Sequence, residues 1–247
     1  MPPLSARAAV LTFLAINSVH AAAASTVIAV APSGPTVPER LLRISVSFAA
    51  PVGGLKAALF RRNGHAIEGA LLDQPLWSPD RRTATLLLDP GRVKTGLIAH
   101  ETAGWALKPG EAVTLRIDGR AVHDWRIRPG GCVVPNPSDW VIAAPKAGTP
   151  DPLSLTFPGA IDAMSRGLIA VADGSGRRVR GVARLTDGER RWVFAPSARW
   201  AAGTWQVVVH PRLENPCGDE PGEAFEHEAG QGLRSERADL RRGFSIN

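Results

Sequence analysis

Short stretches in which apolar and polar residues alternate constrain the fold of this chain more than any other feature. The clearest is residues 42–48, where every second side chain is apolar. Similar stretches are residues 83–88, 112–117, 122–127, 153–157, 168–172, 179–185, 191–194 and 205–210. A period of two is typical of a strand with one buried face. Turn residues separate the stretches and no sustained helical period is present, so we expect an all-β sandwich with little helix.

The same series of patterns occurs twice. Residues 43–52 match 152–161, residues 84–90 match 190–196, and residues 110–115 match 203–208. Ordered matches at similar offsets indicate a tandem duplication. We therefore expect two β-sandwich domains, at residues 25–130 and 138–247, joined by a Pro-containing linker at residues 131–137.

The first 24 residues have the layout of a cleavable secretory signal. Arg7 provides a positive charge, residues 8–19 are largely apolar, and Val19 and Ala21 are small residues at the −3 and −1 positions of a cleavage site. A buried apolar helix is the less favoured alternative. The apolar run is shorter than the roughly 20 residues that span a bilayer. We predict a signal peptide at residues 1–24, no membrane span after its cleavage, and a secreted protein in the periplasm or at the cell surface.

Two cysteines, Cys132 and Cys217, lie in the part of the chain that would be exported. An even number of cysteines in an oxidising compartment favours a disulfide. A metal pair is disfavoured because neither cysteine has a second ligand at the short spacing of a zinc motif. Because Cys132 lies in the expected linker, the bond could set the angle between the domains.

The chain is basic, with a formal net charge of +6, which raises the possibility of nucleic-acid binding. The arginines are scattered along the sequence rather than gathered in one stripe, so we expect no nucleic-acid partner. One local cluster, Arg177, Arg178 and Arg180, follows a Gly-Ser-Gly segment. We interpret it as a solvated hairpin tip in preference to a binding patch.

Motifs for catalysis are not found. The five histidines beyond the signal form no metal-binding spacing with one another: His65, His100, His123, His210 and His227. The sequence has no GxSxG elbow and no phosphate-binding glycine loop. We therefore expect a non-catalytic protein with no catalytic residues, no metal site and no cofactor. The alternative is a cryptic hydrolase, or a carbohydrate-binding accessory domain of an exported enzyme.

The best candidate for an interaction site is the segment from Asp89 to Gly96, together with Trp77. Arg92 and Lys94 could present two cations to an acidic partner, since loops on a rigid sandwich often carry recognition. A structural turn, in which Asp89 accepts local backbone hydrogen bonds, is the favoured alternative. The chain has seven tryptophans and no tyrosine, and we expect most of these rings to be buried.

The order of the motifs resembles the bacterial immunoglobulin-like domain of S-layer and other surface proteins, the SbsA type. Residues 31–34 followed by the strand at 44–48 match its start. Residues 76–80, 89–97 and 192–196 also resemble segments of a group of exported bacterial proteins. The resemblance implies two tandem immunoglobulin-like antiparallel β-sandwich domains outside the cytoplasm, and it implies no activity. We expect a secreted binding or spacer module of the cell envelope whose partner is an unknown protein or glycan.

Overall fold

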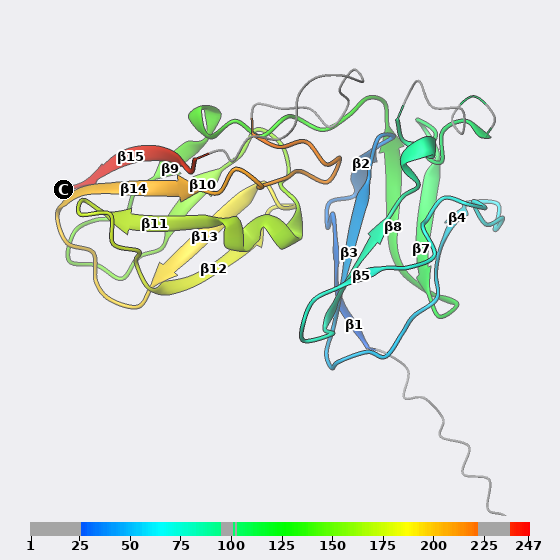
Figure 1. The fold of residues 1–247 in the computed structure, drawn as a ribbon, viewed down its shortest axis with the longest axis horizontal. Helices are drawn as coiled ribbons and strands as arrows, with labels where there is room; N and C mark the ends of the chain where they lie inside the picture. Colours follow the sequence, from blue (N-terminus) through cyan, green and yellow to red (C-terminus); the bar gives the residue numbers. More distant parts are fainter. Residues whose placement is uncertain (1–25, 95–100, 102, 222–237) are drawn as a thin grey trace, which may run out of the picture.

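A computed structural model describes residues 26–94, 101, 103–221 and 238–247. The described chain is built from antiparallel sheets with three short 3₁₀ helices, and it forms two tandem sandwiches, which confirms the expected fold class (Figure 1). The predicted signal peptide lies outside the described residues. No helix among the described residues has both the length and the apolar character needed to cross a bilayer.

The first sandwich consists of two four-stranded sheets, ordered β1-β3-β6-β5 and β2-β8-β7-β4. Their bounds are β1 (Val27–Ala31), β2 (Thr36–Pro38), β3 (Arg43–Phe48), β4 (Ala57–Arg61), β5 (Leu76–Trp77), β6 (Thr83–Leu87), β7 (Ala112–Ile117) and β8 (Arg120–Arg128). All pairings are antiparallel except that of β2 with β8, which is parallel. Helix η1 (Pro90–Arg92) follows β6.

The second sandwich has a four-stranded sheet, β12-β13-β10-β9, and a three-stranded sheet, β11-β14-β15. Its elements are η2 (Pro137–Asp139), β9 (Val141–Ala143), β10 (Leu153–Thr156), η3 (Ala163–Leu168), β11 (Ile169–Asp173), β12 (Gly181–Thr186), β13 (Arg191–Pro196), β14 (Gly203–Val209) and β15 (Leu240–Ile246). In Figure 1 its strands run across the direction of those in the first sandwich.

The strand order identifies both sandwiches as immunoglobulin-like. In the second, the first, second, fifth and fourth strands in chain order form one sheet, and the third, sixth and seventh form the other. This is the ABED and CFG arrangement of an immunoglobulin constant-type domain. The first sandwich has the same arrangement with one extra strand, β2, beside β8. The three internal sequence matches fall on equivalent strands: β3 with β10, β6 with β13, and β7 with β14.

Each sandwich has its own hydrophobic core. The first runs from Val30 to Ile127 and the second from Trp140 to Ile246. Buried tryptophans fill both cores, as the sequence predicted: Trp125, Trp140, Trp192 and Trp200. Three of these indoles donate to backbone carbonyls inside their own sandwich, so burial leaves their polar edge satisfied.

Candidate functional site

The predicted interaction loop is held against the first sandwich by its own polar groups. The Asp89 carboxylate caps η1 by accepting a 2.8 Å hydrogen bond from the backbone N–H of Gly91. The Arg92 guanidinium donates to the carbonyls of Gly104 and Glu68, each at 2.8 Å. These bonds join three segments of the first sandwich, and they support the favoured interpretation of a structural turn. Lys94 is half-buried, and residues 95 and 96 of the predicted loop lie outside the described residues.

Trp77 lies on β5, which is the edge strand of the sheet β1-β3-β6-β5. Its half-buried ring is 6.2 Å from the Phe48 ring, and the Arg81 guanidinium stacks over it at 4.3 Å. The indole therefore closes the edge of the core beneath an arginine. A role for Trp77 or the Arg92 loop in recognition stays a prediction.

A disulfide joins the second sandwich covalently to the interdomain linker. Cys132, in the segment after β8, forms a disulfide with Cys217, in the long connection between β14 and β15, and their Cα atoms are 5.8 Å apart. This confirms the predicted disulfide. It ties the strand connection of the second sandwich that faces the first sandwich to the linker between them (Figure 1).

Hydrogen bonds reinforce this junction from both sides. The Pro216 carbonyl accepts from the backbone N–H groups of Leu42 and Arg43 at 2.9 and 3.0 Å, at the start of β3. The Glu189 carboxylate accepts from the Ser33 N–H at 2.8 Å. Glu189 is a buried non-glycine residue with φ of 60°, a conformation that costs free energy, and in this position it directs its carboxylate toward the first sandwich.

Asn215 organises the connection that carries Cys217. Its side chain is 0 % exposed, and its amide nitrogen donates to the Val133 carbonyl at 3.0 Å and to the Asp219 carboxylate at 2.7 Å. Its oxygen accepts from the N–H groups of Cys217 and Asp219 at 2.9 and 3.0 Å. One buried amide therefore uses both its donor and its acceptor capacity to shape the turn and to hold it against the linker.

Partly or fully buried ionisable groups lie at the same junction. Arg43 of β3 forms an ion pair with Glu214, and the two side chains are 29 % and 14 % exposed. Burial raises the pKa of the Glu214 carboxyl above its ordinary value of 4.5, against the opposing effect of Arg43. Burial also raises the pKa of the Asp162 carboxyl above 3.8, although the Met164 N–H and Arg43 favour its charged form.

Raised carboxyl pKa values can mark a catalytic acid, but the geometry here favours a structural role. Asp162 caps η3 by accepting from the Met164 N–H at 2.9 Å, and its own N–H donates to the Glu214 carbonyl at 2.8 Å. Neither carboxyl lines either of the two cavities described below. Among the described residues, no group of three or more His, Cys, Asp or Glu side chains is arranged to hold a metal ion.

A cavity of about 350 Å³ lies where the sandwiches meet. Proline and small side chains from both sandwiches and the linker make up much of its lining, including Pro32, Val37, Val133, Pro158, Gly188 and Pro216. The backbones approach closely here: a Cβ on Gly159 would lie 2.8 Å from Val133. The cavity is therefore part of the packing between the two sandwiches.

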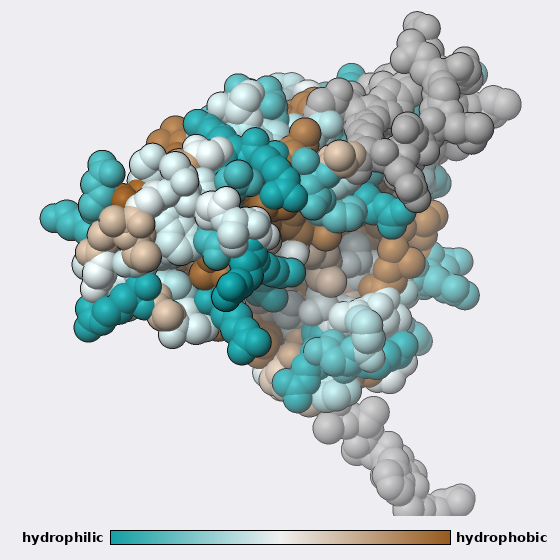
Figure 2. All heavy atoms as spheres, turned by 60° about the vertical axis from the view of Figure 1, so that its left-hand side comes forward, coloured by the Kyte–Doolittle hydropathy of each residue, from teal (hydrophilic) through white to brown (hydrophobic). Residues whose placement is uncertain are grey.

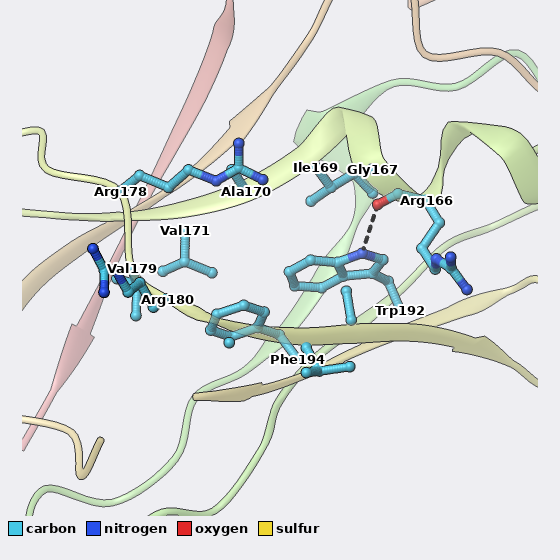
Figure 3. A pocket seen from close by; sticks show the side chains of 13 residues that line it. Arg166, Gly167, Ile169, Ala170, Val171, Arg178, Val179, Arg180, Trp192 and Phe194 are labelled. Carbon is cyan, nitrogen blue, oxygen red and sulfur yellow. Dashed lines mark hydrogen bonds between the residues drawn. The ribbon is translucent and has the colours of Figure 1, made fainter. Parts of the chain in front are cut away.

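A larger cavity, of about 590 Å³, opens at the side of the second sandwich between β11 and β12 (Figure 3). Trp192 and Phe194 of β13 form its inner wall, with ring centroids 5.5 Å apart and ring planes within 5° of parallel. The Trp192 indole donates to the Arg166 carbonyl at 3.2 Å, which fixes the ring beside β11.

Three arginines border this cavity: Arg166 before β11, and Arg178 and Arg180 before β12. Their guanidinium groups are spread around it in Figure 3. All three residues are exposed, and none of their side chains forms an ion pair or hydrogen bond with another described residue. The cluster predicted as a solvated hairpin tip is thus exposed as expected, and it also borders a cavity, which the sequence pattern did not reveal.

Hydrophilic side chains cover much of the visible face of the second sandwich, and the hydrophobic ones form small separate patches (Figure 2). Asp173, in the turn before Arg178, directs its carboxylate into that turn, where it accepts from the N–H groups of Ser175 and Arg177 and from the Ser175 hydroxyl. It is therefore occupied within the turn.

Comparisons with known proteins give similarity in fold alone. No protein-family model matches the sequence, and no curated protein matches it. Among solved structures, the Yersinia pseudotuberculosis adhesin InvE is 12 % identical over 90 % of this chain, with a TM-score of 0.25, and the match spans 58 % of the adhesin chain. Domains 5–6 of the S-layer protein SbsC are 13 % identical over 75 % of this chain and 91 % of theirs, with a TM-score of 0.26. The tandem Ig repeats of Dlar are 12 % identical over 73 % of this chain and 84 % of theirs, with a TM-score of 0.21.

Proposed function

We propose that this chain is a secreted, non-catalytic module of the cell envelope, in which two immunoglobulin-like domains form one rigid binding or structural unit. The domains extend over residues 25–130 and 138–247, with the linker at 131–137. The observation that carries the proposal is the junction. The backbone bonds to Pro216 hold one connection of the second sandwich against the first, and the disulfide between Cys132 and Cys217 and the buried Asn215 amide hold the same connection against the linker.

Rigidity is an unusual property for two domains joined by a short linker. Domains in one chain ordinarily move relative to one another unless their interface is extensive. Here the disulfide and the hydrogen bonds at the junction oppose such motion, and the half-buried ion pair of Arg43 with Glu214 adds a charged contact. A module of this kind holds whatever its second domain binds at a defined angle to the first domain.

The distance distribution between spin labels on the two domains tests this proposal. Labels at Arg62→Cys in the first sandwich and Ser197→Cys in the second occupy exposed positions away from the junction. We expect one narrow distance distribution in the oxidised protein. The same pair in a Cys132→Ala/Cys217→Ala background should give a broader distribution. A broad distribution in the oxidised protein would overturn the proposal of a rigid unit.

The alternative of a hydrolase predicts titratable groups converging on an open cavity. The carboxyls whose pKa is raised, Asp162 and Glu214, instead contact each other's segments and Arg43 at the domain junction. The cavity bordered by the three arginines lies elsewhere in the second sandwich, and none of the residues that line it is an Asp, Glu or His. These arrangements support binding over catalysis.

A further inference from the structure

The cavity between β11 and β12 lies beside a free sheet edge. β12 is the outer strand of its sheet and pairs only with β13 among the described strands. Ser197 donates its N–H to the Arg180 carbonyl at 2.9 Å, which marks residues 180 and 197 as a hydrogen-bonded pair. Because such pairs alternate along an antiparallel ladder, Gly181, Ala183 and Leu185 direct their N–H and C=O groups away from β13. This edge can accept another strand.

Small side chains open the space behind that edge. Val182 points outward and is 74 % exposed, whereas Gly181 and Ala183 face the core. A Cβ on Gly181 would lie 2.4 Å from a ring carbon of Phe194, so glycine is required for that ring to occupy its place. The Phe194 ring thus takes the place of a side chain at Gly181, and the small side chain of Ala183 leaves the opening beside it. A larger side chain at Ala183 would fill that opening.

The charge around the opening specifies the kind of partner. Arg166, Arg178 and Arg180 border it without a carboxylate partner among the described residues, and Arg184 is a further exposed cation on β12. Exposed edge strands carry charge to prevent pairing with other chains of like charge, and the same cations attract a strand of opposite charge.

A peptide fits this opening better than a sugar. The faces of aromatic rings that stack on sugars must be accessible, yet Trp192 is 0 % and Phe194 is 5 % exposed. The accessible groups are unpaired backbone N–H and C=O along β12 and guanidinium groups. Such groups recognise an extended peptide through main-chain hydrogen bonds, while a pocket beside the edge selects alternate side chains.

The geometry points to a binding site for an extended acidic peptide segment, which adds as a strand to the free edge of β12, inserts one apolar side chain between the sheets, and pairs its carboxylates with Arg166, Arg178 and Arg180. The inference deepens the proposed binding function by naming the class of partner. It rests on that function, but it does not depend on the rigidity of the domain junction.

Selection from a library of random nine-residue peptides displayed on phage tests the site. We expect the oxidised full-length protein to enrich peptides rich in Asp and Glu with an apolar residue between them. A synthetic copy of an enriched peptide should lose about tenfold in affinity for an Arg178→Glu/Arg180→Glu variant, since two charge pairs become repulsive. Its affinity should also fall as salt rises.

Matched variants separate this site from general attraction to a basic protein. Arg62→Glu/Arg120→Glu makes the same change in net charge on exposed residues of the first sandwich, and it should leave the affinity unchanged. Ala183→Leu fills the cavity and should weaken binding, whereas Val141→Ala, at an exposed position on β9 at the opposite edge of the same sheet, does not touch the cavity and should not. Circular dichroism and thermal melting check that each variant is folded, and the charge reversal tests the site even where Ala183→Leu does not fold.

Amide hydrogen exchange distinguishes strand addition from other contacts. Binding should slow exchange at Gly181, Ala183 and Leu185, and a peptide with N-methylated alternate amides should not bind. Failure to enrich acidic peptides, equal affinity for both charge-reversed variants, or unchanged exchange at β12 would each overturn the inference. Competition by an oligomer of glucuronic acid in preference to the peptide would assign the cations to an acidic glycan and overturn it as well. In any of these cases a narrow spin-label distribution would still support the proposed rigid module.

Discussion

Removing the disulfide should destabilise the second domain far more than the first. The bond between Cys132 and Cys217 closes a loop of 85 residues, which contains β9 to β14 of the second sandwich. In the chain-entropy model a loop of this length lowers the entropy of the unfolded chain by about 15 cal/mol/K, or about 4.6 kcal/mol at 25 °C. With an m-value of about 2 kcal/mol/M, the urea midpoint of the second domain should fall by about 2.3 M.

Urea denaturation of the wild type and of Cys132→Ala/Cys217→Ala measures this effect. Pulsed hydrogen exchange with mass spectrometry reports unfolding of β13 and β14 separately from that of β3 and β6, so each domain has its own transition. Reduced wild-type protein is the control, because it keeps both sulfur atoms and separates the loop entropy from lost packing around the buried Cys217.

The reduced protein and the double variant should have nearly the same midpoint, well below that of the oxidised protein. A loss of less than about 1 kcal/mol would show that the unfolded chain gains little freedom when the loop opens. An equal loss of unfolding free energy in both domains would show that the junction couples their unfolding, and that the effect of opening the loop is not confined to the second domain.

Three further changes test the packing and the charges of the second domain. Gly181→Ala places a Cβ 2.4 Å from the Phe194 ring and should cost about 1–3 kcal/mol in a urea melt, whereas Gly167→Ala, with no atom within 4 Å, should leave the midpoint unchanged. Asn215→Ala removes four hydrogen bonds at a fully buried position and should lower the free energy of unfolding by about 3 kcal/mol, while an exposed Asn63→Ala control should cost far less. Burial raises the pKa of Asp162, so the contribution of this carboxyl to stability is present at pH values below about 4 and is lost as pH rises through the raised pKa. Asp162→Asn should therefore be more stable than the wild type at pH 7, and the difference in free energy of unfolding should close on acidification. A difference that stays constant with pH would contradict the raised pKa.

The alternating pattern located every strand that has neighbours on both sides. β3, β6, β7, β8, β10, β13 and β14 all lie inside their sheets, and each falls on a stretch with a period of two. Of the edge strands, only β11 and β12 were predicted from the pattern. The others lie at sheet edges and escaped it: β1, β2, β4, β5, β9 and β15. An edge strand is short or partly exposed, so less of its length is required to alternate.

The candidate sites show a similar division. The disulfide could be predicted because two cysteines in a chain predicted to be exported have few other uses. The role of Arg92 could not be predicted. The sequence around an arginine beside a turn does not indicate whether its guanidinium faces solvent or, as here, donates to the carbonyls of Glu68 and Gly104. The cavity could not be predicted either, although Gly181 within a strand was a signal of close approach between a backbone and another group.

By itself, the sequence determined that this chain folds into two similar sandwiches, because alternation along a strand and repetition along the chain are local properties that each stretch carries alone. Only the tertiary structure decided where the second domain is held and where it is open. The contacts of Asn215 with Val133, and the placing of Arg166 and Arg180 at one opening, join residues far apart in sequence. Such contacts arise from how sheets pack and which edges stay uncovered, and no single stretch of the chain encodes them.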